Sequence, residues 1–158
     1  MAGRHGLIRR AAMLVSLALL LATAAHAAPP RPATLPVQVL GPWLTQGGDG
    51  VIAIEACGDA LCGRIVGIRR KPGEPMPRDV HGAPQCGLTI LKRERATAEG
   101  DWLGQITDPR DGKTYGARLW LDARGHLRVR GFLGLPLFGQ TQTWRRFTGT
   151  LGPECRFG

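Results

Sequence analysis

Short apolar runs, each broken after several residues by glycine, proline or aspartate, make up most of this chain beyond residue 40. No long stretch places apolar residues at the spacing of an amphipathic helix, so the pattern predicts strands. Strands spaced this evenly favour an all-β antiparallel sandwich or barrel. We expect eight of them, near residues 41–46, 51–57, 61–69, 87–95, 101–107, 113–121, 126–133 and 138–147.

The first 27 residues have the three parts of a secretory signal peptide. Arginines open the segment, an uncharged apolar run covers 11–25, and a small-x-small cleavage site ends at Ala27. The apolar run is shorter than the roughly 20 residues that span a bilayer. We therefore expect cleavage after Ala27, a periplasmic or secreted protein, and no transmembrane segment once the leader is removed.

Residues 28–158 would form the mature chain. The proline-rich stretch 28–40 predicts an extended lead-in, and 41–158 has the length of a single domain. Loss of the leader removes three of the 21 Lys and Arg residues, which leaves 18 against 12 Asp and Glu, a net charge of +6. The basic residues are scattered rather than clustered, so we expect no nucleic-acid partner. The sequence does not predict an oligomeric state.

Missing residue types exclude several kinds of catalytic site. Residues 28–158 contain no serine and no asparagine, which excludes a serine nucleophile and N-glycosylation. The two histidines there, His81 and His126, are too few for a multi-histidine metal centre. We expect no cofactor and no metal, and we expect that the protein is not an enzyme.

Four cysteines follow the leader, and an even number in an exported chain predicts two disulfides. Three connectivities are possible. Pairing of Cys57 with Cys62 across a hairpin and of Cys86 with Cys155 is the favoured one, because the second bond would tie the tail to the body.

Register arithmetic supports two hairpins. A four-residue turn over 58–61 would pair Cys57 with Cys62, Glu55 with Arg64 and Ala53 with Val66. In the second hairpin, a turn ending at Gly125 would pair Leu121 with Leu127 and Leu119 with Val129, continuing to Tyr115 opposite Leu133. The reverse face of the second hairpin would hold Trp120 opposite Arg128, as a cation–π pair, and Arg118 opposite Arg130.

Two further motifs have structural interpretations. Gly41-Pro42-Trp43 near the first strand, with Arg145 or Arg146 late in the chain, fits the end closure of calycin barrels, in which a late arginine stacks over the tryptophan. Residues 108–112 are typical of a β-turn, with aspartate first, proline second and glycine last. The same turn places Asp108, Lys113 and Tyr115 near one another, which is the strongest acid–base cluster that the sequence offers.

Four sequence blocks, which follow one another along the chain, resemble those of a known family. The chain resembles the DUF2147 family of exported bacterial proteins, whose function is unassigned, and the resemblance implies a small lipocalin-like β-barrel. Cys155 lies outside the blocks, so a Cys62–Cys86 bond remains an alternative. The blocks are Cys57-Gly58-x-x-Leu61-Cys62-Gly63-Arg64-Ile65-Val66, Cys86-Gly87-Leu88-x-Ile90-Leu91, Asp108-Pro109-x-x-Gly112-Lys113-Thr114-Tyr115, and Val129-Arg130-Gly131-Phe132-x-Gly134-x-Pro136-Leu137-Phe138-Gly139-Gln140-Thr141-Gln142-Thr143-Trp144.

The sequence therefore favours a non-enzymatic barrel that binds a small, partly apolar ligand. We expect Tyr115 and Arg64 to contact the ligand, together with Gln142 and Trp144 from the last strand. The alternative is a cell-envelope module that docks anionic polymers or lipid headgroups through the arginines of the second hairpin.

Overall fold

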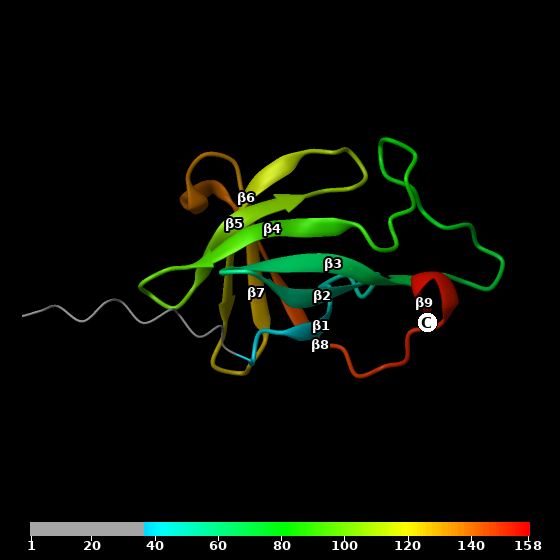
Figure 1. The fold of residues 1–158 in the computed structure, drawn as a ribbon, viewed down its shortest axis with the longest axis horizontal. Helices are drawn as coiled ribbons and strands as arrows, with labels where there is room; N and C mark the ends of the chain where they lie inside the picture. Colours follow the sequence, from blue (N-terminus) through cyan, green and yellow to red (C-terminus); the bar gives the residue numbers. More distant parts are fainter. Residues whose placement is uncertain (1–36) are drawn as a thin grey trace, which may run out of the picture. The chain divides into compact units, whose positions relative to one another are not determined.

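The computed structural model describes residues 37–158 (Figure 1). The expected signal peptide, its cleavage site and most of the lead-in lie outside these residues. Within them the chain consists of strands and two short 3-10 helices, and no helix is long and apolar enough to cross a membrane.

Eight strands lie where the apolar runs predicted them, and a ninth short strand ends the chain. The strands are β1 (Gly41–Leu44), β2 (Gly50–Cys57), β3 (Ala60–Arg69), β4 (Thr89–Ala96), β5 (Trp102–Thr107), β6 (Thr114–Leu121), β7 (Leu127–Phe132), β8 (Gln140–Arg146) and β9 (Arg156–Phe157). The 3-10 helices are η1 (Pro136–Phe138) and η2 (Pro153–Cys155).

The first eight strands form a closed antiparallel barrel. Each pairs with its neighbour in sequence, and β1 also pairs with β8, so every strand has two partners. In such an up-and-down barrel, the loops that follow odd-numbered strands all lie at one end. We call this the open end; loops 45–49, 70–88, 108–113 and 133–139 start from it, and loop 133–139 extends along the outer surface to Asp101 and Trp120. The opposite end, which we call the closed end, carries the short turns that follow β2, β4 and β6.

The second predicted hairpin is confirmed. Leu121 pairs with Leu127, Leu119 with Val129 and Arg118 with Arg130. Gly125 has φ +76 in the turn, a conformation that glycine adopts without strain. The expected Tyr115–Leu133 pair is wrong, because the ladder ends one step earlier at Gly116 and Phe132.

The first hairpin forms with a tighter turn than predicted. Cys57 pairs with Ala60 rather than with Cys62, because Gly58 (φ +67) and Asp59 suffice to reverse the chain. The register is shifted by two residues, so each side chain keeps its predicted face. The expected ion pair still forms on a diagonal, with 2.7 Å between Arg64 Nη2 and Glu55 Oε1. A bulge at Val51 and Ile52 then shifts the register again.

Both favoured disulfides are present. Cys57–Cys62 joins the two strands of the first hairpin, and Cys86–Cys155 ties the loop between β3 and β4 to the tail. The tail is also held by β9, which pairs in parallel with β3 through Ile68 and Arg69. Phe157 packs edge-on against Phe147, with 5.4 Å between the ring centroids.

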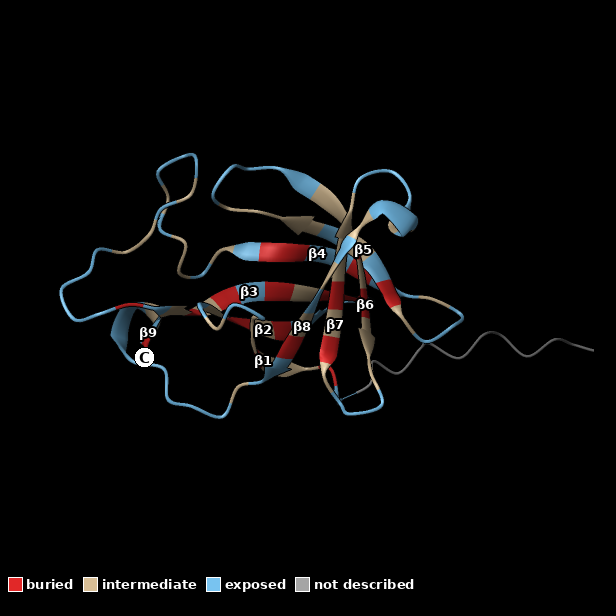
Figure 2. Ribbon diagram, turned by 180° about the vertical axis from the view of Figure 1, so that it is seen from behind, coloured by how far each residue is buried: buried red, intermediate tan, exposed pale blue. Residues whose placement is uncertain are grey.

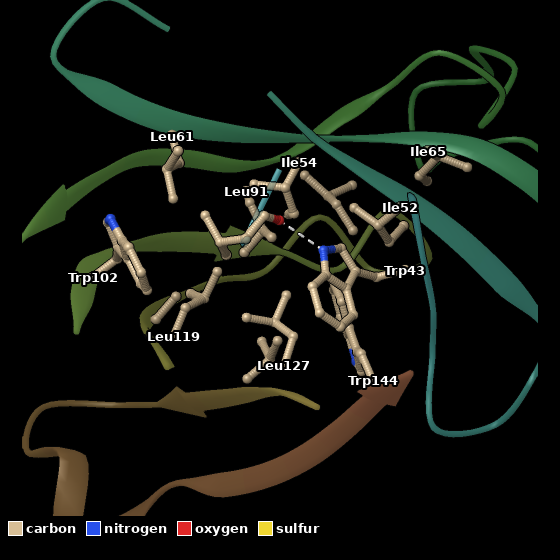
Figure 3. Packing of buried hydrophobic residues seen from close by; sticks show 14 residues of the cluster. Trp43, Ile52, Ile54, Leu61, Ile65, Leu91, Trp102, Leu119, Leu127 and Trp144 are labelled. Carbon is tan, nitrogen blue, oxygen red and sulfur yellow. Dashed lines mark hydrogen bonds between the residues drawn. The ribbon is translucent and has the colours of Figure 1, made fainter. Parts of the chain in front are cut away.

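Alternate positions along the strands face the barrel interior, and most of the residues at these positions are buried (Figures 2 and 3). Because cross-strand partners share a face, the inward rows can be followed around the barrel. The interior is filled with large side chains, most of them drawn in Figure 3. They include Trp43, Ile52, Ile54, Leu61, Leu91, Trp102, Leu119, Leu127, Val129 and Trp144.

Trp43 is wholly buried within this cluster, as its Gly-x-Trp motif predicted. Its Nε1–H donates to the Val39 carbonyl at 2.8 Å, the bond drawn in Figure 3. Arg146, rather than Arg145, covers the ring, with its guanidinium carbon 3.8 Å from the centroid. Arg145 is exposed. Arg146 also donates to the carbonyls of Leu40 and Gln38, so it joins the entering chain to β8.

Candidate functional site

The barrel interior differs between its two ends. Toward the closed end, inward-facing Leu127 and Trp144 pair with each other and are 0% and 2% exposed. Toward the open end, the same two strands pair Val129 with Gln142 and Gly131 with Gln140. Both glutamines are exposed although they occupy inward positions. The interior is therefore accessible to solvent from the open end.

Gly131 provides room at this open end. A Cβ built on Gly131 would have one heavy atom within 4 Å, the Ile106 Cγ2 at 3.7 Å. Ile106 pairs with Tyr115, and both are half-buried. We call these five residues, Ile106, Tyr115, Gly131, Gln140 and Gln142, the mouth.

Three of the four predicted contact residues belong to this region. Tyr115 and Gln142 are mouth residues, and Trp144 lies one inward position deeper on β8. The Trp144 Nε1–H donates to Gln142 Oε1 at 2.8 Å, which fixes the orientation of the Gln142 amide. The direction of the Gln142 side chain, which the sequence leaves open, is thus inward.

Arg64 lies elsewhere. It occupies an outward position on β3, between inward-facing Gly63 and Ile65, and forms the ion pair with Glu55. Its side chain is 47% exposed on the outer surface. The structure therefore does not bring Arg64 to the mouth.

The arginines of the second hairpin face outward, as predicted, but each has a partner. Arg118 pairs with Asp101, with Nε 2.6 Å from Oδ2, and Arg128 lies 3.9 Å from Asp122 Oδ2. The cation–π contact with Trp120 comes from Arg118, at 5.8 Å, and not from Arg128 as expected. Carboxylates thus offset the charge of two of the three arginines.

A groove lies on the outer surface beside this face. It has a volume of about 590 Å3. Its aromatic and apolar wall comes from β6 and η1, and its polar wall from two arginines and an aspartate. The lining residues are Asp101, Arg118, Trp120, Arg130, Pro136 and Leu137.

Residues 41–146, which comprise the whole eight-stranded barrel, match a family described as uncharacterized proteins conserved in bacteria, DUF2147. The chain belongs to this family. No curated protein matches the chain.

The DUF2147 barrel also has a structural neighbour of known family. Protein HP1028 from the human pathogen Helicobacter pylori is described as belonging to the lipocalin family. The alignment has a TM-score of 0.60 and 17% sequence identity, and covers 70% of this chain and 83% of that one. At this identity the likeness shows the fold, a lipocalin-like barrel.

The acid–base cluster expected of Asp108, Lys113 and Tyr115 is not assembled in this DUF2147 barrel. Asp108 is bound by Arg110, whose side-chain hydrogen bond lowers the pKa of that carboxyl. Lys113 Nζ lies 3.3 Å from Asp111. Both aspartates also accept backbone N–H bonds inside the turn, from Arg110 and Lys113, so they serve the turn as predicted. Among residues 37–158 no group of three or more side chains is arranged to hold a metal ion.

Sequence reasoning missed Glu94, the most unusual ionisable group of this DUF2147 barrel. Glu94 pairs with Leu61 on an inward row and is 0% exposed. Neither carboxyl oxygen has a hydrogen-bond partner of good geometry among the described residues. Desolvation raises the pKa of Glu94 to about 8, although the nearby backbone N–H of Gln105 lowers it in part. No pattern identified Glu94, because it lies in the polar run Lys92-Arg93-Glu94-Arg95, which is typical of an exposed strand.

Gly104 explains how the interior accommodates this carboxyl. A Cβ built on Gly104 would lie 2.6 Å from Glu94 Cδ, so a larger residue there would displace the side chain. A bulge at Arg93 (φ 58) turns Glu94 inward, out of the simple alternation along β4.

Proposed function

We propose that this protein is an exported, non-enzymatic binding protein that holds a small, partly apolar ligand at the mouth of its barrel. The observation that carries the proposal is that inward-facing Gln140 and Gln142 are exposed beside Gly131, which has free space above it. The lipocalin-like fold supports it, because eight-stranded barrels of this size can hold one small ligand.

The filled interior limits how deeply a ligand can enter. Leu119, Leu127 and Trp144 close the passage below the mouth, so the ligand would rest on the mouth rather than lie along the barrel axis. This shallow seat favours a small ligand or one end of a longer one.

The side chains of the mouth indicate the chemistry of the ligand. Ile106 and the Gly131 backbone offer an apolar surface, and the Tyr115 hydroxyl and two glutamine amides offer neutral donors and acceptors. No charged side chain belongs to the mouth. We therefore expect an uncharged ligand with an apolar body and a hydroxyl, ester or amide group.

Export is supported by the two disulfides, which persist in oxidising compartments. The leader predicted over residues 1–27 supports the same location.

The experiment that tests this proposal places a larger side chain in the mouth. Gly131→Leu adds a side chain into the free space, and Gly131 has a backbone conformation open to other residues. We expect the mature chain to bind a neutral fluorescent dye such as N-phenyl-1-naphthylamine, and the variant to bind it about tenfold or more weakly, a loss of roughly 1.4 kcal/mol. Equal binding by a folded Gly131→Leu variant contradicts the proposal.

Arg64→Ala is the matched control. Because Arg64 points away from the interior and pairs with Glu55, its removal should leave dye affinity unchanged. Native mass spectrometry of the purified chain, before and after extraction with organic solvent, would then identify the bound molecule.

A further inference from the structure

Exposed apolar side chains are concentrated in one loop of the barrel. Among residues 37–158, eight large apolar side chains are exposed, and four of them fall within residues 133–138. We call this segment the apolar loop. Its exposed members are Leu133 (69%), Leu135 (64%), Leu137 (78%) and Phe138 (76%).

The apolar loop is held in a fixed conformation although its side chains are free. Arg130 donates from Nε to the Pro136 carbonyl at 2.6 Å and from Nη2 to the Leu137 carbonyl at 2.9 Å. It also donates from Nη1 to Thr141 Oγ1 at 2.7 Å. Within the loop, the Phe138 N–H donates to the Leu135 carbonyl. Because the loop is already ordered, its binding to a partner surface costs little further conformational entropy. The exposed side chains are therefore held in position to contact such a surface.

We propose that the apolar loop docks the barrel on the surface of an anionic lipid bilayer. Leucine and phenylalanine side chains would enter the boundary between headgroups and acyl chains. Arg130, which has no carboxylate within ion-pair distance among the described residues, would lie at headgroup level. Residues 37–158 carry 17 Lys and Arg against 12 Asp and Glu, so the whole barrel is attracted to negative charge.

The outer groove fits the same role. Pro136 and Leu137 form one of its walls, so a bilayer reached by the apolar loop also reaches the groove. The groove offers the remaining N–H groups of Arg118 and Arg130, which can bind a phosphate headgroup.

A second copy of the chain is a poorer occupant. A stable dimer buries about 800 Å² on each partner, which is more than four side chains on one short loop supply. Two copies of equal positive charge also repel each other.

This proposal stands apart from ligand binding at the mouth. The apolar loop and the mouth share no residue, so each can be removed without the other. Gly131→Leu should retain binding to vesicles, and a loop variant should retain binding of the neutral dye in the absence of lipid.

The test is co-sedimentation of the mature chain, residues 28–158, with lipid vesicles; the leader must be absent because it would itself bind lipid. The loop variant is Leu135→Ser/Leu137→Ser/Phe138→Ser. The parent should bind vesicles of phosphatidylglycerol and phosphatidylethanolamine, and the loop variant should bind about tenfold or more weakly, because three apolar side chains no longer enter the bilayer. Added salt should weaken binding by the parent.

A matched control replaces three exposed apolar residues outside the loop, as Val37→Ser/Val80→Ser/Leu103→Ser. This control should bind vesicles as the parent does. Equal binding by the loop variant, or failure of the parent to bind, overturns the proposal. Equal binding to pure phosphatidylcholine overturns the choice of an anionic surface. A dimer in sedimentation equilibrium that the loop variant abolishes, without vesicle binding by the parent, would assign the loop to a second copy instead.

Discussion

The two halves of the barrel interior are built from the same strands but for different purposes. At the closed end, inward positions of β6, β7 and β8 hold Leu119, Leu127 and Trp144, all buried. Further along the same strands, toward the open end, stand Ala117 and Gln142, each two residues away, and Gly131, which is four residues from Leu127 and follows buried Val129. Large apolar side chains give way to small or polar ones, so one half is tightly packed and the other is in part accessible to solvent.

Glu94 provides the largest expected effect, because it places an ionisable group in the closed half. Its pKa is about 8 in the folded protein against 4.5 in the unfolded chain. The folded state therefore favours the protonated form of Glu94. The stability that depends on this protonation is fully present below pH 4.5 and is lost as the pH rises to 8. Ionisation of Glu94 over this range should lower the free energy of unfolding by about 5 kcal/mol.

Glu94→Gln should abolish this dependence. We expect parent and variant to have similar free energies of unfolding in urea at pH 4.5, and the variant to be more stable at pH 8. Glu55→Gln, at an exposed ion pair, is the control and should leave the pH slope intact. The same pH slope in the Glu94 variant and the parent would show that Glu94 ionises freely.

Shortening a side chain should lower the free energy of unfolding more in the closed half of the interior than at the mouth. Leu119→Ala leaves a cavity in the closed half and should lower the free energy of unfolding by about 3 kcal/mol. Ile106→Ala, at the half-buried mouth, should cost about 1 kcal/mol, because solvent fills the space. Urea denaturation of both variants measures the difference, and equal costs would mean that the mouth is packed like the core.

Trp144 connects the two halves. Trp144→Phe keeps the buried ring but removes the N–H that binds Gln142 Oε1, which should cost about 1 kcal/mol. Loss of this bond also frees the Gln142 amide, so affinity for the neutral dye should change. If Trp144→Phe has the stability and the dye affinity of the parent, the bond neither stabilises the fold nor orients the Gln142 amide.

The smallest expected effect on stability is at Tyr115. Tyr115→Phe removes a hydroxyl at the accessible mouth and should change the free energy of unfolding by less than about 0.5 kcal/mol. Affinity for ligands that bind this hydroxyl should fall. Thermal melting and dye titration measure the two properties, and a large loss of stability would assign the hydroxyl to the fold.

Much of this protein follows from local sequence patterns. The alternation of Leu119, Leu121, Leu127 and Val129 fixes both a register and an inward face, because a slip of one residue would expose all four. Aspartate–glycine turns and cysteine spacing act over similarly short distances, and they predicted the turns at 108–112 and 122–125 and the favoured disulfides. The strand assignments also placed Tyr115 on the apolar face of the second hairpin, but they left the direction of Gln142 open, because the turn at 134–137 does not fix the register of the last strand.

The tertiary structure decided what depends on contacts between distant strands. The bulge at Arg93 turns Glu94 inward against Gly104, and only the folded β4 and β5 bring these two together. Closure of the barrel placed Arg146 over Trp43 and left Arg64 outside. Strand alternation is a property of neighbouring residues and is therefore legible in the sequence, whereas burial of a charge or the choice between two adjacent arginines depends on which strand lies opposite.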